Sequence, residues 1–540
     1  MANRGSPPSL SETSINYINP ILWEDLPDME VVRVEDTYYM SASSFHFSPG
    51  APILRSNNLV DWEYIGHSIP DLAAFGSQFL MDGRNATGYV KGIWASTLKY
   101  RKSNGLFYWY GAIQGTDQSY IFTAKNPEGS WSSHPPIENF YYDAGLLIDE
   151  DDSFYVAYGT KTIRVAQLSA DGLTEVTSRP VYDSDDYLEG ARMYSINGTY
   201  YIWLTKPWDG QFVLKSNNGP FGPYEYREVL SNMRSPIAGA GAPHQGALVD
   251  TPGGDWYYMA FIDAFPAGRI PVLAPVEFDG EGWPRIIADY ADTRGQWRPE
   301  YPCLKSDHSA KKLGTCIRRH SFSHGKLDCC WEWNQSPDNS KWSIQQGQLL
   351  LETGTVTDSL YLATNTLTHR TTGPMSTATF CINWSKLKDG DRAGASLFRD
   401  QSAYIGIHQD DGATRLVYVD DMTLAPVGEA VGWVNGRPVS KDWAVVSNGG
   451  IKADVSLTHE RVWLRIDVNV AAACVDGYEK EPRQAKFEYS YDGTAFTQLG
   501  PVFTLTNSPT GFVGYRFAIF NFATKALGGK LAVEYCDFEL

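Results

Sequence analysis

The chain has 540 residues, too many for one ordinary domain, and a formal net charge of −18. That charge argues against nucleic acids and anionic membranes as partners, since both repel an acidic protein. The chain is rich in Tyr, Trp, Phe and Gly, and no apolar run approaches the roughly 18 residues of a membrane span. Composition therefore predicts an all-β protein of more than one domain, with neutral or weakly charged partners.

One pattern recurs five times within residues 1–300. A polar or aromatic lead residue is followed by a short apolar run, a polar turn and an aromatic run, as in 142–156; this pattern is typical of a β-hairpin. Copies recur roughly every 45 to 66 residues, a period typical of propeller blades. We therefore predict a five-bladed β-propeller over residues 1–300, with the lead residues Asp28, Trp94, Asp143, Glu189 and His244.

Propeller geometry gives these lead residues a shared position. The innermost strand of every blade runs along the central axis, so equivalent positions from different blades converge on one central cavity. A single acid before a strand is usually a turn former, but three acids brought together repel one another unless some are protonated or a ligand needs them. We interpret Asp28, Asp143 and Glu189 as a catalytic cluster, with Trp94 and His244 beside it.

The remaining segments are interpreted in chain order. Residues 1–18 are polar and are predicted to be a surface strap that closes the propeller against its last blade. Residues 301–320 form a predicted linker, where the pattern breaks into Pro, Cys, Lys and Ser. Residues 321–540 contain short alternating runs without the blade period, which predicts a β-sandwich of jelly-roll or concanavalin-like type.

The cysteines and sequons bear on the compartment. All seven cysteines lie in the latter half without paired CxxC spacing, so zinc is not expected. Cys303 with Cys316, or Cys329 or Cys330 with Cys536, are candidate disulfides, although sequence does not settle pairing. Acceptor sequons begin at Asn85, Asn197 and Asn383. Together these features predict a secreted, extracellular protein.

Converging carboxyls among aromatics suit glycoside hydrolysis. One carboxylic acid protonates the leaving oxygen, and a carboxylate activates water or attacks the sugar. A third carboxylate helps to raise the pKa of the acid, and aromatic faces pack against sugar rings. Calcium binding is the rival use of three carboxylates, but no Asp-rich calcium loop accompanies them. A non-catalytic sugar-binding propeller is the alternative from another functional class.

Residues 19–300 resemble glycoside hydrolase family 43. The motifs that carry the resemblance are Asn19-Pro20-Ile21-Leu22, Leu26-Pro27-Asp28, Pro49 to Ser56, Gly92-Ile93-Trp94-Ala95, Tyr142-Asp143, Glu189-Gly190 and His244-Gln245-Gly246. The resemblance implies a five-bladed propeller that cleaves xylose- and arabinose-containing polysaccharides with inversion. It implies that Asp28 is the general base, Glu189 the general acid, and Asp143 the residue that orients the acid and adjusts its pKa.

The same resemblance assigns two further residues and leaves one ambiguity. Arg269 resembles the sugar-contacting arginine of the family, and His244 resembles its axial histidine, which in some members lies near a bound ion or water. Many members follow the base with Pro-Ser, whereas Met29-Glu30 follow Asp28 here, so Asp25 is an alternative base. The spacing from Asp28 to the aromatic pair of its repeat favours Asp28.

The C-terminal part, with 331–334 and 341–343, resembles the β-sandwich appended to family xylosidases and arabinofuranosidases. That resemblance implies a sandwich that packs on the propeller and helps to shape the substrate cleft. The segments 41–56 and 89–96 resemble fungal arabinoxylan arabinofuranosidases, including those that remove 1,3-linked arabinose from doubly substituted xylose.

We therefore predict an inverting, monomeric α-L-arabinofuranosidase that acts on arabinoxylan or xylo-oligosaccharides, with an exo-acting β-1,4-xylosidase as the alternative. Inversion predicts that the Asp28 and Glu189 carboxyls lie roughly 6.5–9.5 Å apart, whereas about 5 Å would imply retention. No cofactor or catalytic metal is expected, although a structural calcium ion near the axis is compatible with the resemblance. The predicted substrate-binding residues are Phe45, His46, Trp94, Tyr142, His244 and Arg269.

Overall fold

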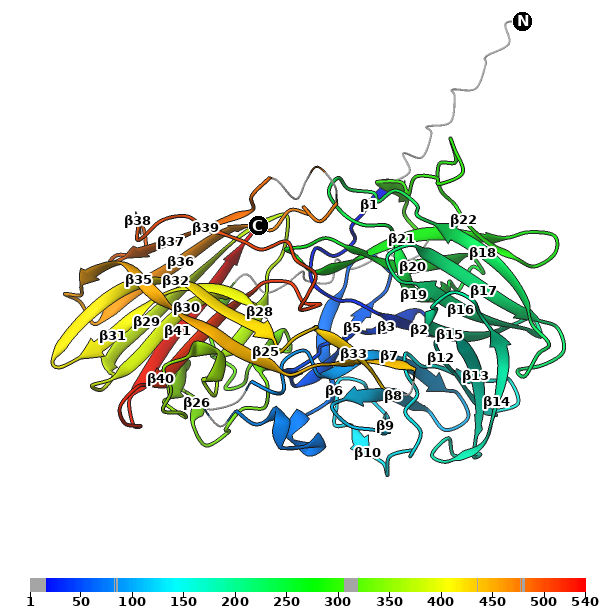
Figure 1. The fold of residues 1–540 in the computed structure, drawn as a ribbon, viewed down its shortest axis with the longest axis horizontal. Helices are drawn as coiled ribbons and strands as arrows, with labels where there is room; N and C mark the ends of the chain where they lie inside the picture. The colour runs from blue at the N-terminus through cyan, green and yellow to red at the C-terminus, as the bar shows by residue number, and fades with distance from the viewer. Residues whose placement is uncertain are drawn as a thin grey trace, which may run out of the picture.

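The computed structural model describes residues 16–81, 83, 86–304, 319–434, 436–475, 477 and 481–540. In these residues the chain forms a propeller and a sandwich that lie side by side (Figure 1). The described helices are three short 3-10 turns, η1 (Leu72–Phe75), η2 (Ser77–Phe79) and η3 (Leu360–Leu362). None of the described helices is long and apolar enough to cross a membrane.

Five four-stranded antiparallel sheets are the propeller blades. In chain order the blades comprise β2 (Glu30–Val34), β3 (Thr37–Ser41), β5 (Gly50–Ser56) and β6 (Glu63–Ile69); β7 (Gly92–Arg101), β8 (Leu106–Gln114), β9 (Ser119–Ala124) and β10 (Ser132–Ser133); β11 (Gly145–Ile148), β12 (Phe154–Gly159), β13 (Thr162–Leu168) and β14 (Glu175–Asp183); β15 (Glu189–Ile196), β16 (Thr199–Lys206), β17 (Gly210–Ser216) and β18 (Glu225–Ser231); and β19 (His244–Asp250), β20 (Trp256–Asp263), β21 (Arg269–Phe278) and β22 (Pro284–Ile286).

The innermost strands close a ring. β2, β7, β11, β15 and β19 are neighbours in that order, and β19 returns to β2. Outside the five blades, the segments that begin and end the propeller part of the chain pair with each other, β1 (Asn16–Ile18) with β23 (Glu300–Pro302). Of the predicted strap only residues 16–18 are described, and they make this pairing. The five predicted blades are confirmed.

Local sequence explains the blade hairpins. Asn197 and Gly198 connect β15 to β16, and both have positive φ, at 51° and 78°. A two-residue hairpin of this type needs positive φ at both positions, which Asn and Gly adopt at low cost. The second strands bury apolar and aromatic side chains on both faces, as in β8, where the consecutive residues Trp109 and Tyr110 are both buried in different clusters, so neighbouring blades pack face to face.

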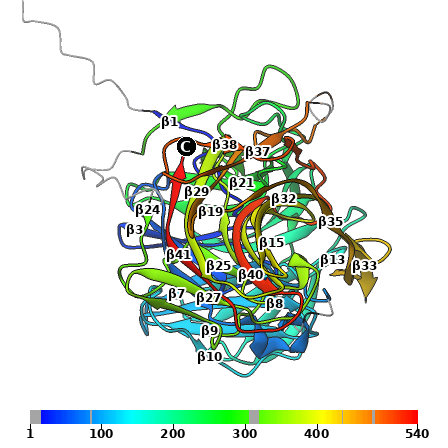
Figure 2. The same cartoon turned by 90° about the vertical axis from the view of Figure 1, so that its left-hand side faces the viewer.

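The C-terminal part is a sandwich of two antiparallel sheets, seen in front of the propeller in Figure 2. One sheet contains, in spatial order, β26 (Trp342–Gln345), β27 (Gln348–Glu352), β41 (Lys530–Glu539), β29 (Met375–Lys386), β36 (Arg461–Asn469), β37 (Gln484–Ser490) and β38 (Thr497–Gln498), with β24 (Arg319–His320) on β41 and β39 (Phe503–Thr504) on β37. The other contains β35 (Trp443–Ser456), β32 (Ala413–Pro426), β31 (Gln401–Asp410), β30 (Asp391–Phe398), β40 (Arg516–Ala523), β28 (Leu367–Arg370), β25 (Trp331–Asn334) and β4 (Phe47–Ser48). The predicted concanavalin-like sandwich is confirmed.

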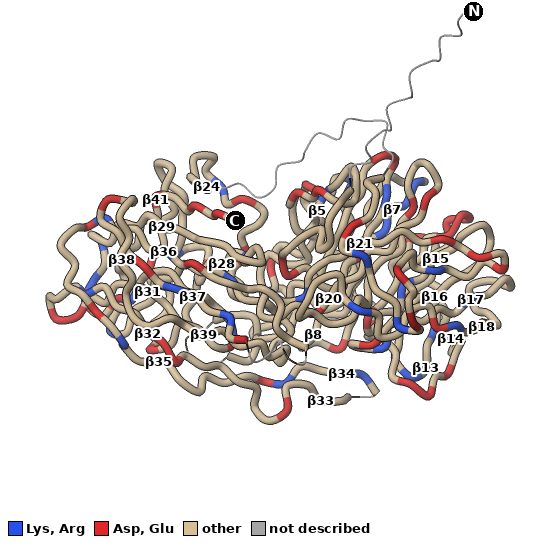
Figure 3. The backbone as a smooth tube through the Cα atoms, turned by 90° about the horizontal axis from the view of Figure 1, so that it is seen from above, with Lys and Arg blue, Asp and Glu red and all other residues tan. Residues whose placement is uncertain are grey.

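The two domains share one sheet. β4 belongs to the propeller half of the chain, yet it pairs with β25 and becomes the edge strand of a sandwich sheet. A separate hairpin of β33 (Val431–Val434) and β34 (Arg437–Ser440) leaves the sandwich and reaches the propeller (Figure 1). Because β4 pairs with β25, the domain interface is built of hydrogen-bonded backbone as well as side chains. Acidic residues lie along the loops of both domains (Figure 3).

The six described cysteines, Cys303, Cys329, Cys330, Cys381, Cys474 and Cys536, are free thiols. The candidate pairing of Cys329 or Cys330 with Cys536 is therefore wrong for the described structure. Cys536 lies within β41 of one sandwich sheet, whereas Cys330 precedes β25 of the other. Cys316, residues 305–318 of the predicted linker and the sequon residue Asn85 lie outside the described residues.

Candidate active site

The five lead residues of the repeats line one cavity of about 330 Å³. Glu189 and His244 begin β15 and β19, Trp94 lies in β7, and Asp28 and Asp143 lie two residues before β2 and β11. Because those strands form the central ring, the cavity lies at the axis of the propeller. The predicted convergence of the repeat positions is thus what the structure contains.

Asp28 is held on both carboxylate oxygens. Its Oδ2 accepts a hydrogen bond from Ser43 Oγ at 2.7 Å, and its Oδ1 pairs with Arg269 Nη1 at 3.0 Å. The backbone of Asp28 has φ 57°, a left-handed conformation that costs energy for a non-glycine residue and is common at functional sites. These contacts fix the carboxylate at the cavity wall.

Asp25, the alternative base, has a different role. Its carboxylate accepts the backbone N–H groups of Arg269 at 2.8 Å and Gly514 at 2.9 Å, and its own carbonyl accepts Arg370 Nε at 2.8 Å. Asp25 is not among the cavity-lining residues. The residue therefore joins blade five to the sandwich, and the carboxylate that faces the cavity from this segment is Asp28.

The carboxyl of Glu189 has a pKa near neutral pH. Burial raises its pKa to about 7, and the negative charge of Asp28 acts in the same direction. Two hydrogen bonds to its Oε2, from the hydroxyls of Tyr142 at 3.1 Å and Tyr187 at 3.2 Å, favour the carboxylate and lower the pKa. The balance suits an acid that must be protonated before reaction and ionised after it.

Asp143 is the third carboxyl. Burial, followed by the charges of Glu189 and Asp28, raises its pKa well above the usual range. Its Oδ2 accepts a hydrogen bond from Gln245 Nε2 at 3.4 Å. Since like charges this close do not all ionise together, the cluster retains a proton near neutral pH.

A buried arginine that the sequence reasoning missed orients the acids. Arg192 of β15 donates to the backbone carbonyls of Asp28 at 2.7 Å, Ser96 at 2.7 Å and Ala144 at 2.9 Å. These carbonyls come from three other blades, so one guanidinium sets the spacing of the strands that carry the acids. Its position three residues after Glu189 was the only signal in the sequence.

The cavity wall is largely aromatic. The Arg269 guanidinium lies 5.4 Å from the ring centre of Phe45 and 5.0 Å from that of Phe261. Trp94 is oriented by a 2.8 Å hydrogen bond from its Nε1 to the Val90 carbonyl. Such faces suit packing against the apolar side of a sugar ring.

Two predicted substrate-binding histidines occupy different places. His244 lines the cavity; its Nδ1 donates to the Ala242 carbonyl at 2.8 Å, and its Nε2 lies 3.8 Å from Asp263 Oδ2. His46 is not among the lining residues: its Nδ1 accepts from the Val90 N–H at 3.1 Å. Burial, with Arg516 nearby, lowers the pKa of His46 to about 3, so it is a neutral residue of the domain interface.

The surroundings of His244 also test the calcium expectation. Calcium takes six to eight oxygen ligands. The described contacts of His244 include one carboxylate, that of Asp263, whose Oδ2 is buried without a hydrogen-bond partner. One histidine and one carboxylate supply fewer ligands than calcium takes, and the calcium expectation stays a prediction.

The sandwich supplies part of the cavity wall. The lining residues from the sandwich are Val431, Trp433, Pro438, Pro509 and Phe512. The propeller adds lining residues that were not predicted: Tyr187, Pro207, Trp208, Gln245, Phe261, Asp263 and Phe265. Trp208 and Trp433 are 62% and 60% exposed, and the Trp433 and Tyr187 rings meet edge-on at 5.2 Å. Large exposed aromatics beside a cavity are typical of sugar-binding surfaces.

Comparisons with known proteins agree with this architecture. The family model for glycosyl hydrolases family 43 matches residues 17–284, and that for the beta-xylosidase C-terminal concanavalin A-like domain matches residues 319–539. A putative beta-xylosidase of Xylanibacter ruminicola is 32% identical over 70% of this chain and 71% of its own. A beta-xylosidase of Formosa agariphila is 28% identical over 97% of this chain and 90% of its own.

Solved structures extend the likeness to three dimensions. A family 43 glycoside hydrolase, engineered at its active site to display both endo-xylanase and exo-arabinofuranosidase activity, is 42% identical with a TM-score of 0.89. The match covers 97% of this chain and 100% of that one. With the five-bladed propeller, the appended sandwich and these matches, the chain belongs to glycoside hydrolase family 43.

Proposed function

We propose that the protein is an inverting α-L-arabinofuranosidase that removes side chains from arabinoxylan, including the 1,3-linked arabinose of doubly substituted xylose. The observation that carries the proposal is that one cavity contains two carboxyls in different surroundings, those of Asp28 and Glu189. Asp28 is ion-paired with Arg269, whereas the pKa of Glu189 is raised to about 7. Two carboxyls with such different surroundings suit a base and an acid.

In the proposed reaction Asp28 takes a proton from water, and the water oxygen attacks the anomeric carbon. The glycosidic bond breaks as Glu189 gives its proton to the departing oxygen. Burial and the charge of Asp28 favour the protonated Glu189 before the reaction, and Asp143 lines the same cavity. Proton exchange with solvent then restores both groups.

Arg269 and the aromatic wall account for sugar binding in the proposal. A guanidinium donates to hydroxyl oxygens without taking part in proton transfer, because it stays charged. It is fixed at Nη1 by Asp28, while its Nε and Nη2 are buried with no hydrogen-bond partner in the described structure. Arg269 lines the cavity, whose volume of about 330 Å³ suits a short saccharide rather than a long polymer.

An exo-acting β-xylosidase is the second candidate. The two relatives described above are named beta-xylosidases, whereas a relative of Bacteroides ovatus, 28% identical over 61% of this chain, is named a non-reducing end alpha-L-arabinofuranosidase. Both activities use the same acids, so the difference lies in the sugar that the cavity accepts.

Product analysis on wheat arabinoxylan, in parallel with aryl arabinofuranoside and aryl xyloside, tests the proposal. Arabinose release with an intact xylan backbone is expected, and NMR of the residual polymer shows which substituted xyloses have lost arabinose. Xylose release from chain ends would assign the β-xylosidase activity instead. NMR of the first product formed tests the mechanism: an arabinofuranoside should give the inverted anomer, and the retained anomer would contradict Asp28 as a base.

We also propose that the protein acts outside the cell as a monomer. A polymeric substrate favours an extracellular location. The described cysteines give this location no support, because none of them forms a disulfide. Activity in culture medium rather than in lysate, and light scattering on the purified chain, test both parts.

A further inference from the structure

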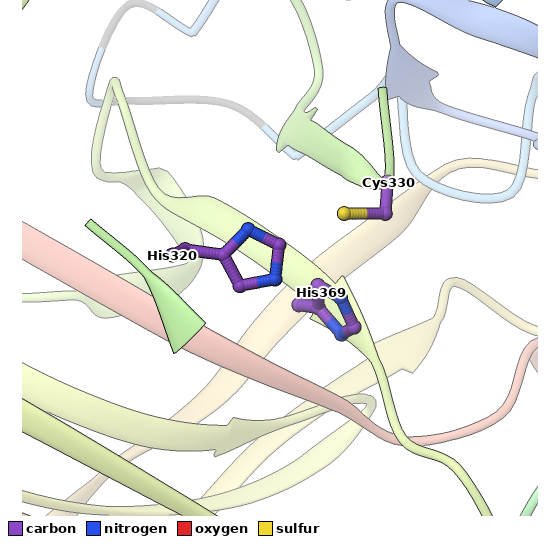
Figure 4. A group of neighbouring side chains, drawn as sticks. All are labelled: His320, Cys330 and His369. Atoms are coloured by element: carbon purple, nitrogen blue, oxygen red, sulfur yellow. The ribbon is translucent and has the colours of Figure 1, made fainter. Parts of the chain in front are cut away.

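Three potential metal ligands meet at one end of the sandwich, away from the catalytic cavity. They are His320 in β24, Cys330 immediately before β25, and His369 in β28, and their side chains face one another in Figure 4. One ligand atom from each residue lies within 4.8 Å of the other two. Among the described residues this is the one such group of three.

The fold explains why these residues meet. Trp331 and His369 are directly opposed in the β25–β28 ladder, which brings Cys330 beside His369. His320 lies on the other sheet, where it pairs with Cys536 of β41. The cluster therefore spans both sheets, and its members come from segments too far apart in sequence to form a short metal-binding motif.

Both imidazoles present an unused ring nitrogen. Nδ1 of His369 donates to the Arg370 carbonyl at 2.8 Å, and Nδ1 of His320 lies 2.6 Å from the Asp328 carboxylate, which accepts. The Trp331 indole N–H also lies 3.3 Å from Nδ1 of His320, but the shorter contact is to the Asp328 carboxylate, which only accepts, so Nδ1 carries the proton. In the neutral rings these bonds leave the lone pair on Nε2. Nε2 of each histidine is buried with no hydrogen-bond partner, and the two residues are only 1% and 2% exposed.

Ordinary core packing does not supply the missing partners. The Phe538 ring stacks on His369 at 4.2 Å, and the Trp331 ring meets both histidines edge-on, at 5.4 Å and 5.2 Å. These rings fix the imidazoles and exclude water, but they offer no donor to Nε2. A ring nitrogen left in this state is unfavourable in an apolar site.

We propose that His320, Cys330 and His369 bind a borderline-soft transition-metal ion, Zn²⁺ being the expected occupant and copper the competitor. Imidazole and thiolate are the ligands that these ions prefer. Asp328 would fix the His320 ring, as outer carboxylates do for metal-bound histidines. Metal–ligand bonds of about 2.0–2.3 Å would draw the three atoms to within about 4 Å of one another.

The charges also balance. On binding, the Cys330 thiol loses its proton to solvent and its sulfur becomes a thiolate ligand. The ion brings two positive charges, and the thiolate with the Asp328 carboxylate brings two negative ones. The nearby cations Arg370 and Arg516 share the single carboxylate of Glu332, so this balance covers only the ion, the thiolate and Asp328. A bound ion would cross-link the two sheets at the start of the sandwich.

Metal content of the full-length protein tests the site. The chain is stripped with a chelator, loaded with excess zinc sulfate, desalted and analysed by mass spectrometry. About one zinc per chain is expected in the wild type and in Cys381→Ser, which loses a buried thiol elsewhere in the same sandwich. Cys330→Ser and His369→Gln should hold less than about a tenth of that. Equal zinc in the wild type and Cys330→Ser would overturn the proposal.

Two further measurements test the site, and the first uses the wild type alone. Cobalt-loaded wild type should show a thiolate-to-cobalt charge-transfer band, and its absence would overturn the proposal. Asp328→Asn, which keeps all three ligands, should weaken zinc binding about 10–100-fold in competition with a chelator; unchanged affinity would contradict the role of Asp328. Parallel titration with copper identifies the preferred ion. Glycosidase activity should be the same with and without metal, since none of the three ligands lines the cavity.

Discussion

At the scale of single residues, the site depends on how differently three buried carboxyls are surrounded. Asp28 has a guanidinium and a hydroxyl as partners, whereas Glu189 has two phenols and no cation in direct contact among the described hydrogen bonds. Asp143 has a 3.4 Å hydrogen bond from the Gln245 side-chain amide and a backbone hydrogen bond from Gly190. Burial penalises every charge, so the carboxyl with the weakest compensation keeps its proton longest.

Glu189→Gln tests the proposed acid. Turnover of arabinoxylan should fall about 10²–10⁴-fold, because the glutamine cannot protonate the leaving oxygen. The loss should be smaller for an aryl glycoside with an acidic phenol, which departs without a proton. Oligosaccharide binding by calorimetry should survive, and the exposed control Glu150→Gln should match the wild type. Unchanged turnover in Glu189→Gln would favour the non-catalytic propeller.

The pH profile gives a second test at this scale. The acid works only when protonated, so kcat/KM should fall as pH rises through about 7, the pKa to which burial raises Glu189. Tyr187→Phe removes a hydrogen bond that favours the carboxylate, so this alkaline limb should move to higher pH. Asp143→Asn replaces a carboxyl that keeps its proton longer than Glu189 does, so it should move this limb less than Tyr187→Phe does. A shift to lower pH in Tyr187→Phe would contradict the assignment of this limb to Glu189.

At the scale of elements, the β33–β34 hairpin connects the sandwich to the cavity. Its Arg437 guanidinium pairs with Asp117 at 2.6 Å and stacks over Phe140, and its Pro438 carbonyl accepts Gln114 Nε2 at 3.2 Å. These contacts hold the hairpin on blade two and on the chain that leads into blade three. They place Trp433 beside Tyr187, at the edge of the catalytic cavity.

Trp433→Ala tests the hairpin as part of the substrate surface. KM for arabinoxylan should rise several-fold, since loss of one stacked aromatic removes about 0.5–1.5 kcal/mol of contact. Kinetics on a small aryl glycoside should change less, and the free energy of unfolding should stay within about 0.5 kcal/mol, because the side chain is mostly exposed. Val434→Ala, on the same hairpin but outside the cavity lining, is the control. Equal effects of both variants would argue against stacking by Trp433.

At the scale of the whole molecule, one buried carboxylate adds ion pairs to the β4–β25 backbone pairing that joins the domains. Glu332 of the sandwich meets His67 of blade one at 3.1 Å and Arg370 and Arg516 at 3.0 Å and 2.6 Å. Burial opposes its ionisation, but the two arginines dominate and hold the pKa of Glu332 below its usual range. Arg370 also donates to the Asp25 carbonyl, which connects this network to the segment that carries Asp28.

Glu332→Gln should destabilise the protein by about 3–5 kcal/mol at pH 7, since two arginines would lose their buried counter-charge. Because the folded pKa is lowered, the stability that Glu332 contributes is present above about pH 4.3 and decreases as pH falls below it. The difference from wild type in urea unfolding should therefore narrow in acid. The control Glu352→Gln, which removes the half-buried ion-pair partner of Lys530 nearer the surface, should cost no more than about 1 kcal/mol. A difference that grows below pH 4 would contradict this linkage.

The blades, the sandwich and the central acids were predictable from sequence. Hairpin periodicity and turn residues are local properties, and a repeat places equivalent residues at equivalent positions around an axis. Asp28, Trp94, Asp143, Glu189 and His244 were found for that reason, and the structure brings all five to one cavity. The choice between Asp25 and Asp28 followed from spacing alone.

Other features depend on contacts between residues distant in the chain. Trp433 and Phe512 line the cavity only because β4 joins a sandwich sheet and the β33–β34 hairpin crosses to the propeller. Arg192 orients the acids because it donates hydrogen bonds to backbone carbonyls of three other blades. His46 follows the cavity residue Phe45 in the chain, yet it faces the domain interface. The His320, Cys330 and His369 cluster likewise joins two sheets. Sequence determined the repeat and therefore the acids; tertiary structure decided the cavity walls and the domain contacts, because these depend on the packing of one domain against the other and no local period encodes it.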